Sequence, residues 1–152
     1  MQGPPERIAP QSLADYLEAL TKAVFDAGLS WRVVESKWPG FVEAFHGFDP
    51  AWVAGLTPPE IETLEQDRRI VRNRAKIEAT VSNAATMMEL DAEHGGFRGY
   101  LRSHGGYEAT VADMKRRFRY VGDSSLYHFL YVVGEPTPEH EAWMAQHSAH
   151  RR

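Results

Sequence analysis

The segment RFRYVGDSS, residues 117–125, joins two helical segments through a glycine-containing turn. The first helix ends near Phe118, and the second begins after Gly122 with an acidic residue and two small hydroxyl residues. Backbone N–H groups at such a helix start lack intrahelical partners, and with the helix dipole they bind a phosphate without side-chain charge. The segment therefore predicts either a joint that grips a DNA backbone at Gly122, Ser124 and Ser125, or an ordinary helix–turn–helix joint.

Basic side chains surround this turn. Lys115, Arg117 and Arg119 would attract a DNA backbone and make the affinity depend on salt. If the joint is only structural, the same side chains are solvated.

Residues 68–76, RRIVRNRAK, form a second basic segment. In a helix, Arg69, Arg72 and Lys76 would share one face, because residues three and four apart are neighbours. Such a stripe would track phosphates, with Arg72 and Arg74 as DNA contacts, or it would be a solvated face that pairs with nearby glutamates and braces the fold.

Helix-start signals recur along the rest of the chain, and no convincing alternation of polar and apolar residues predicts a strand. We expect an all-α fold of about eight to ten short helices. One domain over residues 1–152 is expected, with a loose lead-in at 1–11 and a polar tail at 146–152. Expected starts are Ser12, Asp49-Pro50, Thr57-Pro58, Asn73 (or Arg68, for the longest helix) and Thr110; expected ends include Gly28, Pro39-Gly40 and Gly95-Gly96.

The composition narrows the function classes. The chain has 152 residues and no cysteine. The absence of cysteine excludes disulfides, thiol nucleophiles and cysteine-ligated zinc. Because the net charge is −4, nucleic-acid binding must rest on local basic patches rather than on bulk charge. Neither a membrane-spanning run nor a secretory signal is evident, so a cytoplasmic monomer is expected.

The candidate chemical groups are few. The tryptophans, tyrosines and phenylalanines would provide stacking planes for an extruded base, although most of them belong to a core. Asp26, near the end of the first helix, would orient a base or a water molecule, or is a plain surface acid. The histidines at 140, 147 and 150 make only a weak zinc site without cysteines, so no metal and no cofactor are expected. No serine–histidine–aspartate order, phosphate loop or dinucleotide motif occurs.

Four segments in this order resemble the DNA-3-methyladenine glycosylase I family. They are AGLSW at 27–31, FHGFDP at 45–50, IVRNRAKIEA at 70–79 with Asn83-Ala84, and FRYVG at 118–122 followed by Tyr127, Phe129 and Val133-Gly134. The resemblance covers about residues 13–134. It implies the helix-hairpin-helix DNA glycosylase fold, with the hairpin in the 117–125 region.

The resemblance also implies an activity: an alkylated, positively charged purine of the 3-methyladenine class is flipped from double-stranded DNA, and its N-glycosidic bond is cleaved. Trp31 matches the family's pocket tryptophan, which stacks on or borders the flipped base. The family's glutamate is replaced by Ala23, so Asp26 is the hypothetical substitute. The family's zinc, held by cysteines and histidines, has no cysteine ligands here, so packing through Trp143 and Met144 is expected to hold the termini.

These departures leave two alternatives open. The chain would be a catalytically degenerate relative that binds DNA or a modified base without excision. The second alternative is a protein that keeps this fold but no longer binds DNA and instead binds a partner, which the acidic net charge allows.

Overall fold

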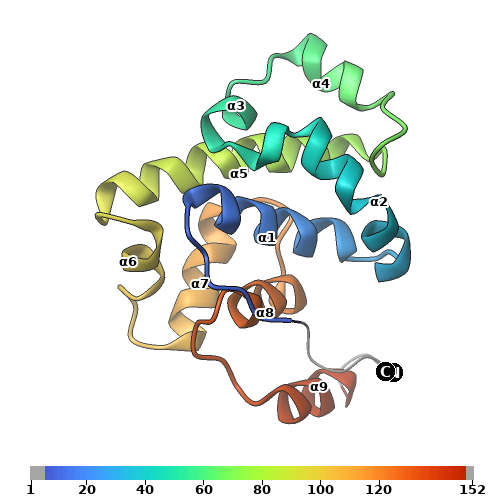
Figure 1. Ribbon diagram of the computed structural model, residues 1–152. Coiled ribbons are helices and arrows are strands. Elements are labelled where there is room, and N and C mark those ends of the chain that lie inside the picture. Colours follow the sequence, from blue (N-terminus) through green and yellow to red (C-terminus); the bar gives the residue numbers. More distant parts are fainter. Residues whose placement is uncertain (1–5, 150–152) are drawn as a thin grey trace.

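The protein is all-α, as predicted. The computed structural model describes residues 6–149, and within that range no strand occurs. No helix in the described range is long and apolar enough to cross a membrane. The elements are α1 (Leu13–Asp26), α2 (Trp31–Ala44), the 3-10 turn η1 (His46–Phe48), α3 (Pro50–Ala54), α4 (Pro58–Leu64), α5 (Arg74–Glu93), α6 (Phe97–Leu101), α7 (Tyr107–Arg117), α8 (Asp123–Val132) and α9 (His140–Ala149) (Figure 1).

Most helix starts lie where the capping residues predict them. The Ser12 side chain accepts from the Asp15 backbone N–H, and Asp49 caps α3 in the same way at Ala51. Thr57 and Glu60 form a capping box at α4. The longest helix, α5, begins after Asn73, whose Oδ1 accepts from the Lys76 N–H at 3.1 Å.

Two expected boundaries are wrong. Helix α2 does not end at Pro39-Gly40 but continues to Ala44. Pro39 is exposed, so the backbone bond that it cannot donate is lost on the solvent side, while buried Phe41 and Ala44 extend the apolar stripe of the helix. Thr110 caps nothing, because α7 already begins at Tyr107, and its hydroxyl bonds back to the Gly106 carbonyl.

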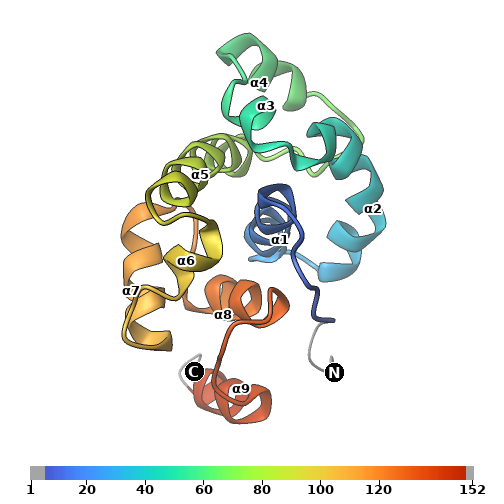
Figure 2. The same ribbon diagram turned by 60° about the vertical axis from the view of Figure 1, so that its left-hand side comes forward.

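Helix α1 forms the centre of the molecule. Figure 2 shows it between α2 on one side, α5 on the other and α8 below. Its Leu17, Leu20 and Phe25 side chains are fully buried, and the Phe25 ring meets the Phe41 ring of α2 edge-on at 4.7 Å. Because α1 packs against α2, α5 and α8, its last turn is held in a defined position, where it can carry functional side chains.

The two ends of the described chain lie together on α8. The Ile8 backbone N–H donates to the Val132 carbonyl at 2.8 Å. On the other side, Trp143 of α9 stacks on Tyr127 at 4.3 Å, and the Tyr127 hydroxyl donates to the Pro138 carbonyl. Packing through Trp143 therefore attaches α9, as expected. Helix α9 extends past residue 146 into the expected polar tail, whose last three residues, like residues 1–5, lie outside the described range.

Candidate nucleic-acid interface

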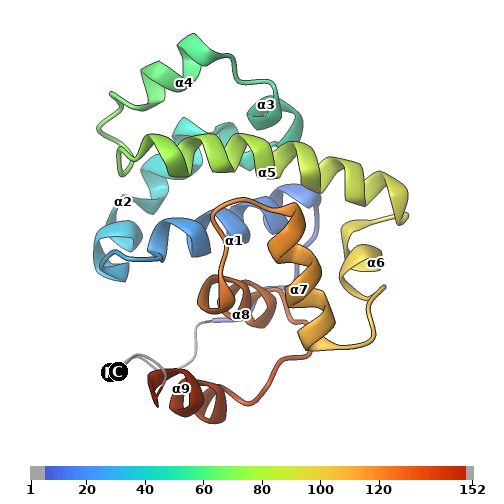
Figure 3. The ribbon, with the colours of Figure 1, turned by 180° about the vertical axis from the view of Figure 1, so that it is seen from behind.

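The hairpin between α7 and α8 is fastened to α5. The Arg119 backbone N–H donates to Oδ1 of buried Asn83 at 2.8 Å, and the Asn83 amide donates back to the Arg119 carbonyl at 3.1 Å. Figure 3 shows the connection passing beneath α5. The next residue, Tyr120, has φ 62° and is 52% exposed. A tyrosine in the left-handed region costs conformational energy, and such strain persists where the surrounding structure imposes it.

The start of α8 offers unpaired backbone donors. Within the described chain, the N–H groups of Asp123, Ser124 and Ser125 form no hydrogen bond. Gly122 has an extended backbone (φ −136°), and a Cβ there would meet nothing within 4 Å. The fold itself therefore tolerates a side chain at Gly122, and the open space allows another molecule to approach the amides closely. Ser124 is exposed, whereas the Ser125 side chain is 7% exposed and faces the core.

Three of the five basic residues predicted to contact DNA form ion pairs within the protein. Lys115 pairs with Asp123, Arg117 with Asp113 at 2.9 Å, and Arg74 with both Glu65 and Glu78. Arg119 and Arg72 are exposed and form no ion pair with a described carboxylate. The latter two are thus the immediately available cations of the predicted set.

Asp113 organises the base of α7. Its carboxylate accepts from the Tyr100 hydroxyl at 2.7 Å, from Arg116 and Arg117, and contacts His104 Nε2 at 3.2 Å. Burial alone would raise the pKa of Asp113, but these donors outweigh it and hold the pKa well below its ordinary range. Thr110 lies beside His104, yet its hydroxyl also donates to the Gly106 carbonyl. We interpret this group as a structural anchor.

The junction of α1 and α2 carries the predicted base site. Trp31 is the first residue of α2 and is 44% exposed, so its ring is available for stacking. Asp26 is the last residue of α1. Between them, Ala27–Ser30 form the turn that corresponds to the AGLSW motif. The two predicted side chains therefore lie on either side of one short connection.

Lys76 is not a phosphate contact, and the predicted basic stripe through Arg69, Arg72 and Lys76 does not exist. The helix begins only at Arg74, so Arg69 and Arg72 lie in the preceding loop. Lys76 is buried, and its Nζ donates to the carbonyl oxygens of Phe25 at 3.2 Å and Ala27 at 2.6 Å. It thereby caps the C-terminal end of α1 with a positive charge.

Asp26 has an unusual environment. Its Oδ1 atom is buried and has no hydrogen-bond partner in the described chain. Burial raises its pKa to about 6; Lys22 and Lys76 oppose the rise and Glu35 adds to it. A partly buried carboxylate with a raised pKa, at the same helix junction as an exposed tryptophan, is a candidate functional group. Ala23, where the resemblance implies a glutamate, is buried with no polar atom to offer.

The hairpin and the α1–α2 junction meet at Lys76. The Lys76 Nζ lies 5.7 Å from the centre of the Tyr120 ring, while it bonds to the carbonyls on both sides of Asp26. The structure thus brings the predicted base site and the predicted phosphate grip to one side of α5. The segments that form these sites are more than 80 residues apart in sequence, so the contact between them is non-local.

Comparison with known proteins agrees with this arrangement. The family described as methyladenine glycosylase matches residues 10–116. The chain belongs to this family. DNA-3-methyladenine glycosylase of Haemophilus influenzae is 30% identical over 129 residues, covering 71% of this chain and 70% of that protein. DNA-3-methyladenine glycosylase 1 of Escherichia coli is 29% identical over 129 residues, covering 71% and 69%.

The comparison of folds gives the same result. A crystal structure of a variant of 3-methyladenine DNA glycosylase I, in complex with 3-methyladenine, superposes with a TM-score of 0.73 at 25% identity. The superposition covers 84% of this chain and 80% of that one. The resemblance to the methyladenine glycosylase family, and the all-α fold that it implied, are both confirmed.

The residues of this methyladenine glycosylase do not fit the zinc clip that the resemblance implies. The sequence has no cysteine, and residues 6–149 contain no group of three or more histidine, cysteine or acidic side chains that could hold a metal ion. His140 instead lies about 6.0 Å, ring to ring, from Tyr127 and Tyr131. Aromatic packing of α9 on α8 therefore involves His140, one of the histidines considered for zinc.

Sequence reasoning missed several residues of the site. Lys22 pairs with Glu35 at 2.5 Å and lies near Asp26, and His128 of α8 has its pKa lowered by burial and by neighbouring Lys22 and His140. Lys76 was assigned to the wrong surface. The spacing of Lys22 and Asp26, four residues apart on α1, was the one available signal, because such residues lie on one helix face.

Proposed function

We propose that this protein is a DNA glycosylase that removes an alkylated purine of the 3-methyladenine class from double-stranded DNA, acting as a monomer. Family membership supports the reaction class, and its relatives carry that name. The observation that carries the proposal is the buried, unpartnered carboxylate oxygen of Asp26 at the junction that also presents Trp31.

In the proposed reaction the alkylated purine is extruded from the duplex and stacks on Trp31. Its positive charge already weakens the N-glycosidic bond, so little acid catalysis is needed. The bond breaks with its electron pair going to the purine, and water adds to the sugar C1′ atom and loses a proton. Ionised Asp26 stabilises the cationic base and the positive charge that develops on the sugar.

The grip on DNA in this proposal comes from the hairpin. The free amides after Gly122 take one phosphate, and Arg119 holds the adjoining backbone. Lys115 and Arg117 contribute there only by exchanging an internal carboxylate for a phosphate, since Asp123 and Asp113 pair with them. Ser124 offers its hydroxyl, and Ser125 offers its amide alone because its side chain is buried.

A degenerate relative that binds a modified base without excision is the second candidate. The observation that favours it is Ala23, which places a buried methyl group where the resemblance implies a glutamate. The two candidates differ in one respect only, namely whether the glycosidic bond breaks.

The test is release of free base from methylated duplex DNA, measured by liquid chromatography. The proposal predicts 3-methyladenine release by the wild-type protein, a strong loss in Asp26→Asn, and wild-type release by Glu62→Gln, which changes an exposed acid on α4. Binding of methylated duplex without release would establish the degenerate relative instead. Equal release by wild type and Asp26→Asn would remove Asp26 from the mechanism.

A further inference from the structure

The cations of the described chain differ in their partners. Most of the arginines on α5, α6 and α7, and the loop residue Arg69, are engaged by carboxylates or by a tyrosine. Arg68 and Arg72, by contrast, are exposed and form no ion pair with any carboxylate between residues 6 and 149, and Lys37 binds only a backbone carbonyl. These three cations gather in one place.

That place is a pocket of about 380 Å³ between α2 and the loop before α5. Lys37, Arg68 and Arg72 supply its charged wall. The remaining lining residues are Val33, Ile70 and Val71. No acidic side chain lines it, although the protein as a whole carries a net charge of −4.

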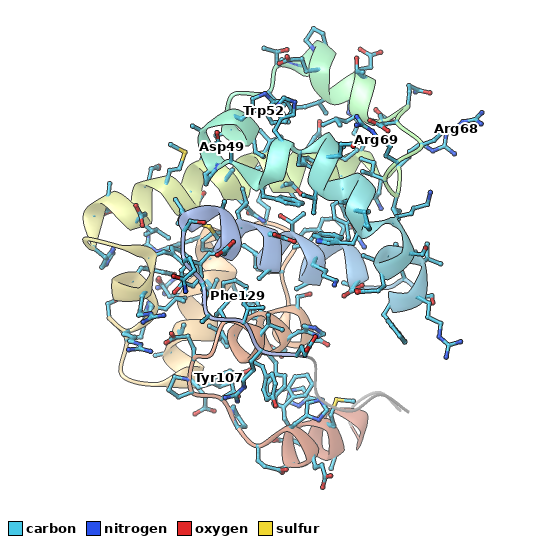
Figure 4. All side chains as sticks on the ribbon, viewed as in Figure 1. Asp49, Trp52, Arg68, Arg69, Tyr107 and Phe129 are labelled. Atoms are coloured by element: carbon cyan, nitrogen blue, oxygen red, sulfur yellow. The ribbon has the colours of Figure 1, made fainter. Side chains whose placement is uncertain are left out.

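The loop that carries the arginines is held in a defined position. A Cβ on Gly40 of α2 would lie 2.4 Å from the Arg69 carbonyl oxygen, so the close approach of the loop to the helix requires glycine there. The Lys37 Nζ donates to the Arg68 carbonyl at 3.0 Å, and the Arg69 side chain bonds to Asp67 and Glu43. In Figure 4, Arg68 extends away from the body of the protein, whereas Arg69 lies back along it.

The pocket is next to the base site. Val33 is two positions after Trp31 at the start of α2, and Arg72 lies in the loop four residues before Lys76, which bonds to the carbonyls flanking Asp26. A strand that presents a base to Trp31 would therefore continue over this pocket. The cations, which have no carboxylate partners, are complementary to the phosphates of DNA, and the apolar lining residues are complementary to its deoxyriboses.

We infer that this pocket is a second DNA-backbone site, which binds the sugar-phosphate chain next to the extruded base through Arg68, Arg72 and Lys37. The inference rests on the proposed function. It adds a contact surface on α2 and the 68–72 loop, which shares no residue with the hairpin. The hairpin would hold one phosphate by its amides, and this pocket would hold others by charge.

The test compares Arg68→Ala and Arg72→Ala with Arg98→Ala, a matched loss of one exposed charge on α6, which lies away from α2 (Figure 1). The probe is a fluorescein-labelled duplex that contains a tetrahydrofuran abasic-site analogue, and its affinity is measured by anisotropy from about 50 to 200 mM salt. We expect each pocket variant to bind more weakly and to reduce the slope of log affinity against log salt by about 0.9. Arg98→Ala should keep the wild-type slope.

A second readout separates this surface from the chemistry. At subsaturating protein, the rate of base release from methylated duplex should fall in Arg68→Ala and Arg72→Ala by the same factor as the affinity, because a backbone contact binds substrate and transition state alike. An unchanged salt slope in both variants, or an equal loss in Arg98→Ala, overturns the inference. Salt-dependent binding without base release overturns the proposed function alone, and absence of salt-dependent binding by wild type overturns both.

Discussion

The Nζ atom of Lys76 donates a 2.6 Å hydrogen bond to the carbonyl oxygen of Ala27, the residue that follows Asp26. With a second bond to the Phe25 carbonyl, this lysine closes the end of α1 and fixes the backbone on both sides of the candidate catalytic carboxylate. A buried cation on α5 thus holds the backbone that carries a carboxylate on α1. The relationship connects the most central helix of the fold to its proposed chemistry.

Replacement of Lys76 should therefore destabilise the protein. Lys76→Met keeps most of the side-chain volume but leaves two carbonyl groups without a donor, at a cost of about 2–4 kcal/mol in the free energy of unfolding. Urea denaturation measures it, with Lys115→Met as the control, because that exposed ion pair contributes about 1 kcal/mol or less. A Lys76→Met protein as stable as the control would show that the two bonds carry little weight.

Trp31→Ala should affect activity and leave stability nearly unchanged. The ring is 44% exposed, so its removal opens no cavity in the core. Stacking on a base is worth about 1–3 kcal/mol, which predicts a loss of about 5- to 150-fold in kcat/KM for base release. Trp52→Ala, which removes another incompletely buried tryptophan on α3, is the matched control. Wild-type release by Trp31→Ala would contradict a stacking role.

Whether a feature of the fold could be predicted from the sequence depends on how far apart the interacting residues lie in the chain. Capping residues such as Ser12, Asp49 and Thr57 act within one turn, so they predicted helix starts correctly. Pro39 misled because its effect depends on whether the lost bond faces solvent, and that follows from tertiary packing. The motif order predicted the family, which the comparisons confirm.

The candidate site was harder to predict for the same reason. Trp31 and Asp26 stand on a continuous motif, so the resemblance led to them, and their roles remain predictions. The partners of Lys76 and Asn83 are 36 to 51 residues away in the chain, and no local pattern encodes such contacts. The ion pairs of Arg74, Arg117 and Lys115 could likewise not be predicted from the basic segments alone, because the basic residues do not show which acidic residues pair with them.

The attachment of α9 should depend on one aromatic stack. Trp143 is 5% exposed and lies between Tyr127 at 4.3 Å and His147 at 3.7 Å. Trp143→Ala should lower the free energy of unfolding by about 3 kcal/mol, and Trp143→Phe should restore part of the loss. Limited proteolysis followed by mass spectrometry would show cleavage before α9 in Trp143→Ala. Protection equal to wild type would mean that other contacts hold this helix.

Asp26 should make stability depend on pH. Its pKa is raised from 3.8 to about 6 in the folded protein, so ionisation disfavours the folded state. The free energy of unfolding therefore falls as pH rises from about 4 to 6, and the cost is fully present above about pH 6. Above that pH, Asp26→Asn should increase the free energy of unfolding by about 1–2 kcal/mol, after allowance for solvent screening, and should raise the melting temperature accordingly. Near pH 4 it should give no gain. A gain that is equal at both pH values would not come from ionisation.

The same titration gives the most direct test of the central claim, that ionised Asp26 beside Trp31 drives the release of an alkylated base. The measurement is the single-turnover rate of 3-methyladenine release from methylated duplex between about pH 5 and pH 8. The wild-type rate should rise with an apparent pKa of about 6, and Asp26→Asn should show a low, flat profile. A wild-type rate without this rise, or an Asp26→Asn profile that matches wild type, would contradict the claim.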